Sequence, residues 1–262
     1  MDILCEKTSV TLGGERIVSD VTMKAIDKQF VGIIGPNGSG KSTLLKCIYR
    51  ILKPSSGAVF IDNEALQAMS VKDSAKKLAV VSQHNYYNFD FTVQEVVLMG
   101  RAPHKNRMEG DTQQDYEIVY DALQKVGMEN YSNRIFSTLS GGEQQRIILA
   151  RAVAQQTKCM ILDEPTNHLD IKHQLQILNL VKCLDLTVIA ALHDLNIAAM
   201  YCDFIYVLKD GEVRAEGSPK EILTKELLKD IYEVDAKITT DPLTGILNVV
   251  YQSVIRNTNL KN

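Results

Sequence analysis

Gly35-Pro36-Asn37-Gly38-Ser39-Gly40-Lys41-Ser42-Thr43 is the stretch of this chain that decides its fold. It fits the pattern G-x-x-x-x-G-K-[ST], whose glycines let successive backbone N–H groups point at phosphate oxygens. Residues 30–34 read as a buried strand before it, and residues 43–48 as a helix whose positive N-terminus favours an anion. Lys41 would bring its charge to the β- and γ-phosphates, and the Ser42 hydroxyl would bind Mg²⁺. The stretch therefore predicts a nucleotide-binding loop between a strand and a helix.

Length and composition narrow the class of protein. The chain has 262 residues, of which 45% are hydrophobic and 23% are charged, as is ordinary for a globular protein. A formal net charge of -3 argues against general nucleic-acid binding, which needs a basic surface. No apolar run is long enough to span a membrane, and residues 1–5 lack the features of a signal peptide. We expect a cytoplasmic protein that reaches a membrane only through a partner, with its scattered cysteines reduced.

Apolar runs and turn residues alternate along most of the chain in the manner of an α/β protein. The first strands are predicted to form an antiparallel pair joined by Gly13-Gly14. A mostly helical block from about residue 88 to about residue 156 interrupts the pattern, which resumes over residues 159–201. Residues 236–254 predict a small β element. The alternating strands should form a parallel sheet that gathers ligand-binding residues at the carboxyl ends of its strands.

An apolar strand that ends in two carboxylates, Met160-Ile161-Leu162-Asp163-Glu164, is the second motif. At a nucleotide-binding edge Asp163 is placed to bind Mg²⁺, usually through water, and Glu164 to polarise the attacking water. Paired acids can also form a solvated turn or a helix cap. The phosphate-binding loop upstream favours the nucleotide role.

Leu139-Ser140-Gly141-Gly142-Glu143-Gln144-Gln145-Arg146 is the third motif. Ser140 is suited to cap a helix, and the glycines allow close packing where the helix begins. These local preferences explain a helix start at this point. They do not explain the whole octet in a chain that already carries a phosphate-binding loop.

With these motifs in this order, the chain resembles the nucleotide-binding subunits of ATP-binding cassette (ABC) transporters. Residues 139–146 resemble the family's signature motif, and Gln83 stands where its Q-loop glutamine belongs. Thr166-Asn167-His168-Leu169-Asp170 resembles the D-loop, and His193 the switch histidine. The resemblance covers nearly the whole chain in the right order.

The resemblance implies an α/β P-loop NTPase fold of the ABC cassette type. Such a fold has a parallel-sheet core, an N-terminal antiparallel β subdomain and an inserted helical subdomain. The nucleotide-binding domain would span residues 1–235, with the helical subdomain inserted at about 88–156. Residues 236–262 would form a small β extension packed on it.

The resemblance also implies a head-to-tail dimer with ATP and Mg²⁺ bound between two copies. The phosphate-binding loop of one copy would then face Ser140, Gly141 and Gly142 of the other, with Asp170 at the same site. Gln83 would sense both Mg²⁺ and the attacking water and report to a membrane partner. His193 would contact the γ-phosphate, and Glu164 would act either as the sole general base or together with His193.

Three kinds of cassette protein compete: an importer ATPase, an exporter half, and a soluble ATPase of repair or translation. A single cassette without membrane helices or a coiled coil favours a bacterial importer. Residues 91–104 are similar to the Gly-Arg-x-Pro-His segment of ATPases for iron-siderophore, haem and vitamin B12 uptake. Zinc or manganese import and a soluble, non-transport ABC ATPase are the alternatives.

The hypothesis of an importer ATPase predicts particular partners and ligands. We expect a second copy of the chain, a permease dimer docked near Gln83 and the helical block, and indirectly a substrate-binding protein, but no nucleic acid. The subunit would lie at the cytoplasmic face of the bacterial membrane. Leu12 stands where the family often has an aromatic residue that stacks on adenine, so the choice between ATP and GTP stays open.

Overall fold

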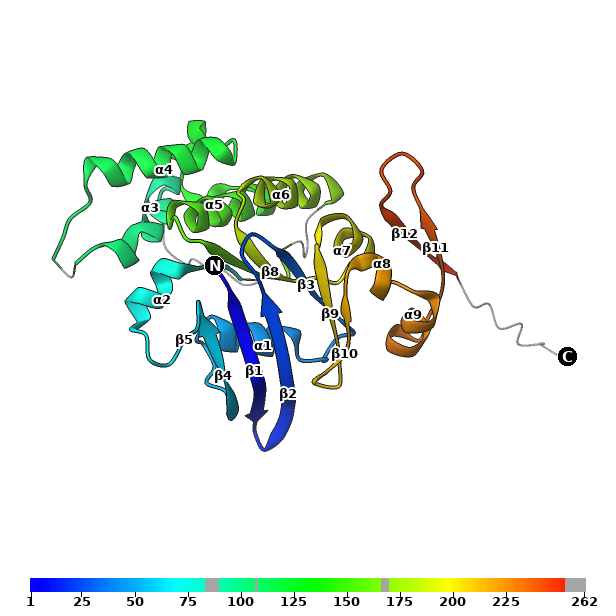
Figure 1. Cartoon of the computed structure of the whole chain (residues 1–262). Coiled ribbons are helices and arrows are strands. Elements are labelled where there is room, and N and C mark those ends of the chain that lie inside the picture. Colours follow the sequence, from blue (N-terminus) through cyan, green and yellow to red (C-terminus); the bar gives the residue numbers. More distant parts are fainter. Residues whose placement is uncertain (83–89, 107, 166–169, 253–262) are drawn as a thin grey trace, which may run out of the picture.

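A six-stranded sheet forms the centre of the molecule (Figure 1). The computed structural model describes residues 1–82, 90–106, 108–165 and 170–252. The strand order is β10-β9-β3-β8-β7-β6, with β10 antiparallel to β9 and the remaining neighbours parallel. The strands are β3 (Phe30–Ile34), β6 (Leu78–Val81), β7 (Cys159–Asp163), β8 (Thr187–Ala191), β9 (Phe204–Lys209) and β10 (Glu212–Gly217).

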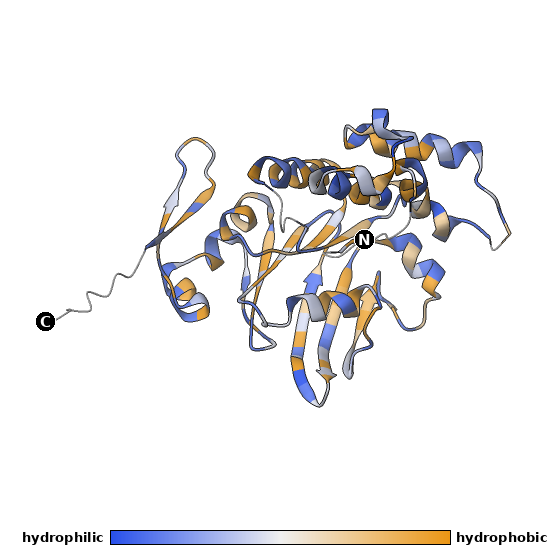
Figure 2. Ribbon diagram, turned by 180° about the vertical axis from the view of Figure 1, so that it is seen from behind, coloured by the Kyte–Doolittle hydropathy of each residue, from blue (hydrophilic) through white to orange (hydrophobic). Residues whose placement is uncertain are grey.

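The central strands are covered on both faces, which is why their sequences are apolar without alternation. Every residue of β3, β7 and β8 is buried. In β3, Val31 and Ile33 pack into one core with α1 (Lys41–Ile48), while Phe30 and Ile34 pack into a second core. That second core contains α5 (Gly141–Ala154), α6 (Ile171–Cys183) and α7 (Leu195–Tyr201), whose ribbons alternate between apolar and polar residues (Figure 2).

A separate antiparallel sheet lies on the α1 side, in the order β2-β1-β4-β5. Its strands are β1 (Ile3–Leu12), β2 (Glu15–Ala25), β4 (Ser56–Ile61) and β5 (Glu64–Ala65). Gly13 and Gly14 join β1 to β2 with φ angles of 58° and 86°. Two successive positive φ angles make the hairpin turn whose twist matches the strands, so glycine suits both positions. The predicted N-terminal antiparallel subdomain is confirmed.

The helical block is the insertion that the sequence predicts. It contains the helices α3 (Val93–Leu98), α4 (Gln113–Lys125) and α5. Between them lie the 3₁₀ helices η1 (Met99–His104), η2 (Glu129–Tyr131) and η3 (Phe136–Thr138). The helix α2 (Val71–Lys77) precedes β6 and contacts η1. The sequence pattern does not predict η1, which contains the whole Gly-Arg-x-Pro-His segment.

A buried ion pair explains η1. Arg101 Nε lies 3.0 Å from Asp115 Oδ1, and both side chains are 8% exposed. Arg101 also donates to the carbonyl oxygen of Ala154 at 2.8 Å, and His104 Nε2 lies 2.8 Å from the carbonyl oxygen of Gln155. The Gly-Arg-x-Pro-His segment therefore ties α4 and the end of α5 together.

The C-terminal part of the described chain packs beside the central sheet (Figure 1). It consists of α8 (Pro219–Ile222), α9 (Lys225–Tyr232) and a hairpin of β11 (Asp235–Thr240) and β12 (Leu247–Gln252). The Asn196 side chain of α7 accepts from the Val249 N–H at 2.7 Å and donates to the Val249 carbonyl at 3.3 Å. Within the described ranges, no helix combines the length and the hydropathy needed to cross a membrane.

Candidate nucleotide-binding site

The loop between β3 and α1 takes a path that only glycine allows at two points. Gly35 has a φ of 149° and Gly40 a φ of 98°. A Cβ atom on Gly35 would lie 2.0 Å from the carbonyl oxygen of Leu208, and one on Gly40 would lie 2.8 Å from that of Ile17. The glycines of the motif are therefore required by the close approach of β9 and β2, as well as by the turn itself.

Lys41, the first residue of α1, is 4% exposed. Its Nζ donates to the carbonyl oxygens of Gly35 at 2.8 Å and Pro36 at 2.9 Å. Burial lowers the pKa of Lys41, although the charges of Glu164 and Asp163 oppose that shift. A poorly hydrated cation on the inner side of the loop is suited to attract the phosphates of a nucleotide.

Ser42 and Asp163 come together from α1 and the end of β7. Ser42 Oγ donates to Asp163 Oδ1 at 2.8 Å, and Tyr49 Oη donates to Asp163 Oδ2 at 3.2 Å. Neighbouring ligands of an octahedral Mg²⁺ lie about 3.0 Å apart when each is about 2.1 Å from the ion. The two oxygen atoms thus fit one Mg²⁺. The described residues hold no cluster of three His, Cys, Asp or Glu side chains that could bind a metal. A Mg²⁺ at Ser42 and Asp163 would also take oxygen ligands from the nucleotide and from water.

Glu164 and His193 follow β7 and β8, which are adjacent and parallel. His193 Nε2 lies 2.5 Å from Glu164 Oε1. Glu164 adopts a left-handed φ of 54°, which turns the chain sharply at the end of the strand. Both residues line a cavity of about 280 Å³ together with Ile17 and all residues from Asn37 to Thr43. The predicted convergence of the loop with Glu164 and His193 at one sheet edge is therefore present in the structure.

The predicted signature residues lie elsewhere. Ser140 caps α5 in a capping box, in which its N–H donates to Glu143 Oε2 at 2.8 Å and its hydroxyl accepts from the Glu143 N–H at 3.4 Å. The hydrogen bond from the Ser140 hydroxyl is the main cause that lowers the pKa of Glu143. Beside the helix start, a Cβ on Gly142 would lie 3.3 Å from the His173 ring. Ser140, Gly141 and Gly142 do not line the loop cavity.

Asp170 is also outside that cavity. It caps α6, where it accepts from the His173 N–H at 2.9 Å, and this bond is the main cause that lowers the pKa of Asp170. Gln83 and residues 166–169 were expected at the site, but they fall outside the described residues.

Two residues at the site were not anticipated from the sequence. Ile17 lines the cavity from β2, whereas Leu12 is 42% exposed at the end of β1 and does not line it. Tyr49 reaches Asp163 from α1. Of these two residues, only Tyr49 could have been found from the sequence. Positions 42 and 49 are two helical turns apart and therefore lie on the same face of the helix.

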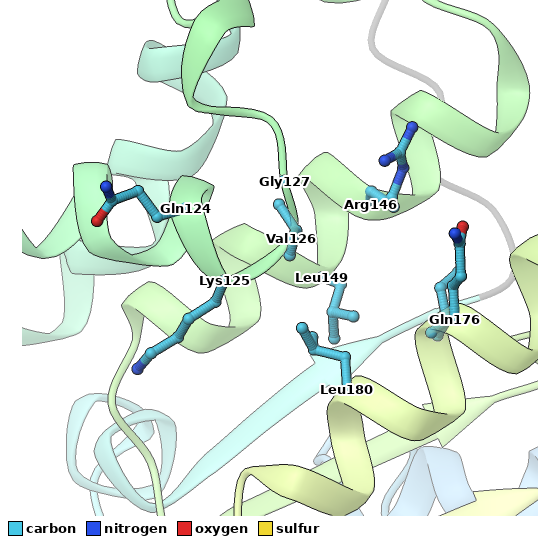
Figure 3. A pocket seen from close by; sticks show the side chains of 9 residues that line it. Gln124, Lys125, Val126, Gly127, Arg146, Leu149, Gln176 and Leu180 are labelled. Carbon is cyan, nitrogen blue, oxygen red and sulfur yellow. The ribbon is translucent and has the colours of Figure 1, made fainter.

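A second cavity, of about 390 Å³, lies between the end of α4, α5 and α6 (Figure 3). Val126, Leu149 and Leu180 contribute apolar surface to it. The charged ends of Lys125 and Arg146 extend in opposite directions in Figure 3. A nucleotide site needs polar groups that converge on the ligand, and the polar groups of this cavity do not converge.

The fold and the site define a class: an α/β protein of the P-loop NTPase type, with its phosphate-binding loop, acidic strand end and histidine at one sheet edge. The particular family follows from comparison with known proteins. The chain belongs to the ABC transporter family, whose model matches residues 18–167. The predicted cassette fold is thereby confirmed, and so is ATP binding as the property of the family.

Similar proteins cover most of the chain. It is 40% identical over 244 residues to the cobalamin import ATP-binding protein BtuD of Halobacterium salinarum, with 92% of this chain and 61% of that protein covered. It therefore spans less than two thirds of that relative's length. It is 38% identical over 256 residues to the iron(3+)-hydroxamate import ATP-binding protein FhuC of Bacillus subtilis, with 96% and 95% covered. A solved dimeric cassette, MJ0796 bound to ADP and Pi, is 31% identical with a TM-score of 0.72, covering 83% of this chain and 98% of that chain.

Proposed function

We propose that the chain is the ATP-hydrolysing subunit of a bacterial importer for iron-siderophore, haem or cobalamin. The assignment as an ATPase rests on one observation: the phosphate-binding loop, Glu164 and His193 line the same cavity. The importer part is supported by relatives named for cobalamin import and iron(3+)-hydroxamate import. The cargo itself would never touch this subunit.

The residues of the cavity have the chemistry for hydrolysis. Lys41 and the N–H groups of the loop would hold the β- and γ-phosphates, and Ser42 with Asp163 would hold Mg²⁺. When bound, Mg²⁺ supplies positive charge against the phosphate oxygens. Glu164 would take a proton from the water that attacks the γ-phosphorus, while the bond to ADP breaks and the negative charge passes to ADP beside Lys41. His193 would hold the γ-phosphate and fix Glu164 through their contact.

A second copy of the chain would complete the site. In one chain the cavity contains no residue of the signature octet. Ser140 and Gly141 at the start of α5 are exposed, and the helix dipole there is suited to an anion. A head-to-tail dimer would bring this helix start over the γ-phosphate of the other copy, in agreement with the dimeric state of the MJ0796 cassette.

The permease would dock in a groove between the core and the helical block. This groove has a volume of about 560 Å³ and is lined from α1, α2, β6, η1 and α5. Val71, which is 73% exposed, and Pro103 of η1 are among the residues that line it. Apolar side chains among polar ones suit a short partner helix. Docking there would hold the subunit at the cytoplasmic face of the membrane.

Two lysines of the same helix test the nucleotide assignment. Lys41→Ala should weaken binding of a fluorescent ATP analogue by about 10- to 100-fold, because a charge-assisted hydrogen bond contributes about 1.5–3 kcal/mol. Lys46→Ala is the matched control, since Lys46 lies in α1 but does not line the cavity. Equal affinities of the two variants would exclude the loop as the phosphate site. Uptake of labelled ferric hydroxamate and cobalamin by cells that express the chain with its permease would test the import assignment.

A further inference from the structure

Tyr49 holds one oxygen of the carboxylate that we assign to Mg²⁺. It is the C-cap residue of α1, and its hydroxyl donates to Asp163 Oδ2 at 3.2 Å. Ser42, at the other end of the same helix, donates to Asp163 Oδ1 at 2.8 Å. Both carboxylate oxygens are thus held from one face of α1.

The same tyrosine also forms part of the wall of the groove between the core and the helical block. Tyr49 lines this cavity of about 560 Å³ beside Arg50, with Ala102 and Pro103 of η1 among the other lining residues. Its side chain is half-buried and packs against the α1 core. Tyr49 therefore contacts the candidate metal site through its hydroxyl and the candidate docking groove through its surface.

We propose that Tyr49 is a positioning residue that orients Asp163 for Mg²⁺. Through Tyr49, this orientation depends on whether the permease occupies the groove. This inference rests on the proposed function, which assigns Asp163 to Mg²⁺. In this proposal the side chain of Tyr49 alone connects the groove to the nucleotide site.

The geometry makes the link sensitive to small movements. A distance of 3.2 Å is at the long end of the hydrogen-bond range, so a further displacement of the ring by a fraction of an ångström breaks the bond. The terminal torsion of an aspartate is broad, and of the two hydrogen bonds described for Asp163 the one from Ser42 would then remain. Loss of a group that orients a metal-binding carboxylate lowers metal affinity by roughly tenfold or more.

The first test removes only the hydroxyl. Tyr49→Phe should raise the Mg²⁺ concentration needed for half-maximal binding of a fluorescent ATP analogue roughly tenfold, and weaken Mn²⁺ binding measured by electron paramagnetic resonance to the same extent. Binding of the analogue in EDTA should be unchanged. The control is Tyr201→Phe, which removes another hydrogen-bonded hydroxyl, 2.8 Å from Asn179 Oδ1. If Tyr49→Phe and Tyr201→Phe require the same Mg²⁺ concentration, the positioning role is excluded.

The second test fills the groove. A Cys183→Ser background removes the exposed cysteine, and Ala102→Cys then places a thiol on the groove wall for a bulky maleimide. Labelling should raise the Mg²⁺ concentration needed for binding severalfold when Tyr49 is present, and leave it unchanged in Tyr49→Phe. The difference between the two backgrounds measures the coupling between the groove label and the Tyr49 hydroxyl. An equal effect in both backgrounds, or no effect with Tyr49 present, would overturn the proposed link.

Asp163→Asn separates this inference from the proposed function. If Asp163→Asn removes the Mg²⁺ dependence of nucleotide binding while Tyr49→Phe matches the unmodified chain, the inference fails and the metal assignment stands. If Asp163→Asn keeps the normal Mg²⁺ dependence, the metal assignment fails and the inference fails with it.

Discussion

The carboxylate of Glu164 is the group whose removal should slow ATP hydrolysis most. Its side chain is only 13% exposed and lies 2.5 Å from His193 Nε2. Glu164→Gln keeps the size and shape of the side chain, so it should leave the lining of the cavity intact. The amide cannot accept the proton of the attacking water, and it no longer provides a negative charge beside His193.

The magnitude follows from the role of a general base. Such a group contributes about 10²–10⁴ in rate, which corresponds to roughly 3–5 kcal/mol of activation free energy. Nucleotide binding should change little in the same variant, because Lys41 keeps its two carbonyl partners in the loop. Loss of the Glu164 charge removes one attraction for the Lys41 ammonium and one repulsion of the γ-phosphate, and these effects oppose each other.

Phosphate release under single-turnover conditions measures the chemical step, and a fluorescent ATP analogue measures affinity. Glu117→Gln on the exposed face of α4 is the matched control, with the same substitution at a surface position. Turnover of Glu164→Gln within about twofold of that control, far from the loss expected of a general base, would refute the assignment. A large loss of ATP affinity would instead show that Glu164 belongs to the binding site.

Three further outcomes test the fold around the site. Gly35→Ala should abolish binding of the ATP analogue because its Cβ would meet the Leu208 carbonyl, while Gly110→Ala, with open space around it, should bind normally. Asp115→Ala should lower the free energy of unfolding in urea by about 3–5 kcal/mol by leaving the buried Arg101 charge unpaired; a loss below about 1 kcal/mol, the value of an exposed pair, would contradict this account. Burial opposes ionisation of Asp115, but hydrogen bonds and nearby positive charges outweigh it and hold its pKa well below the usual range. This stabilisation should be present above the unfolded pKa of about 3.9 and disappear as pH falls below it, and Asp115→Asn should lose that part of the pH dependence.

The central sheet could be predicted from the sequence because burial on both faces leaves short, wholly apolar strands. The strand β3 has the predicted bounds. The helix α5 begins at Gly141, where the capping preference of Ser140 predicts a helix start, and Ser140 and Glu143 form a capping box there. The 3₁₀ helix η1 was missed because its stability depends on Asp115, which lies on another helix.

The site was predictable in part for a similar reason. Parallel strands end at one edge, so the order of motifs was enough to bring the loop, Glu164 and His193 together. Ile17 was not predictable, because it reaches the cavity only through the packing of β2 against the loop. The catalytic and binding roles assigned to these residues, and the roles of Gln83 and Asp170, stay predictions.

A site shared between two copies is the central claim, and complementation of two inactive variants tests it most directly. Lys41→Ala would lack a working loop and Ser140→Arg a working signature helix, so each protein alone should hydrolyse almost no ATP. An equal mixture should recover up to about a quarter of normal activity, since random pairing makes half the dimers mixed and each mixed dimer has one complete site of two. A mixture no more active than its components, or full activity of Ser140→Arg alone, would contradict the shared site.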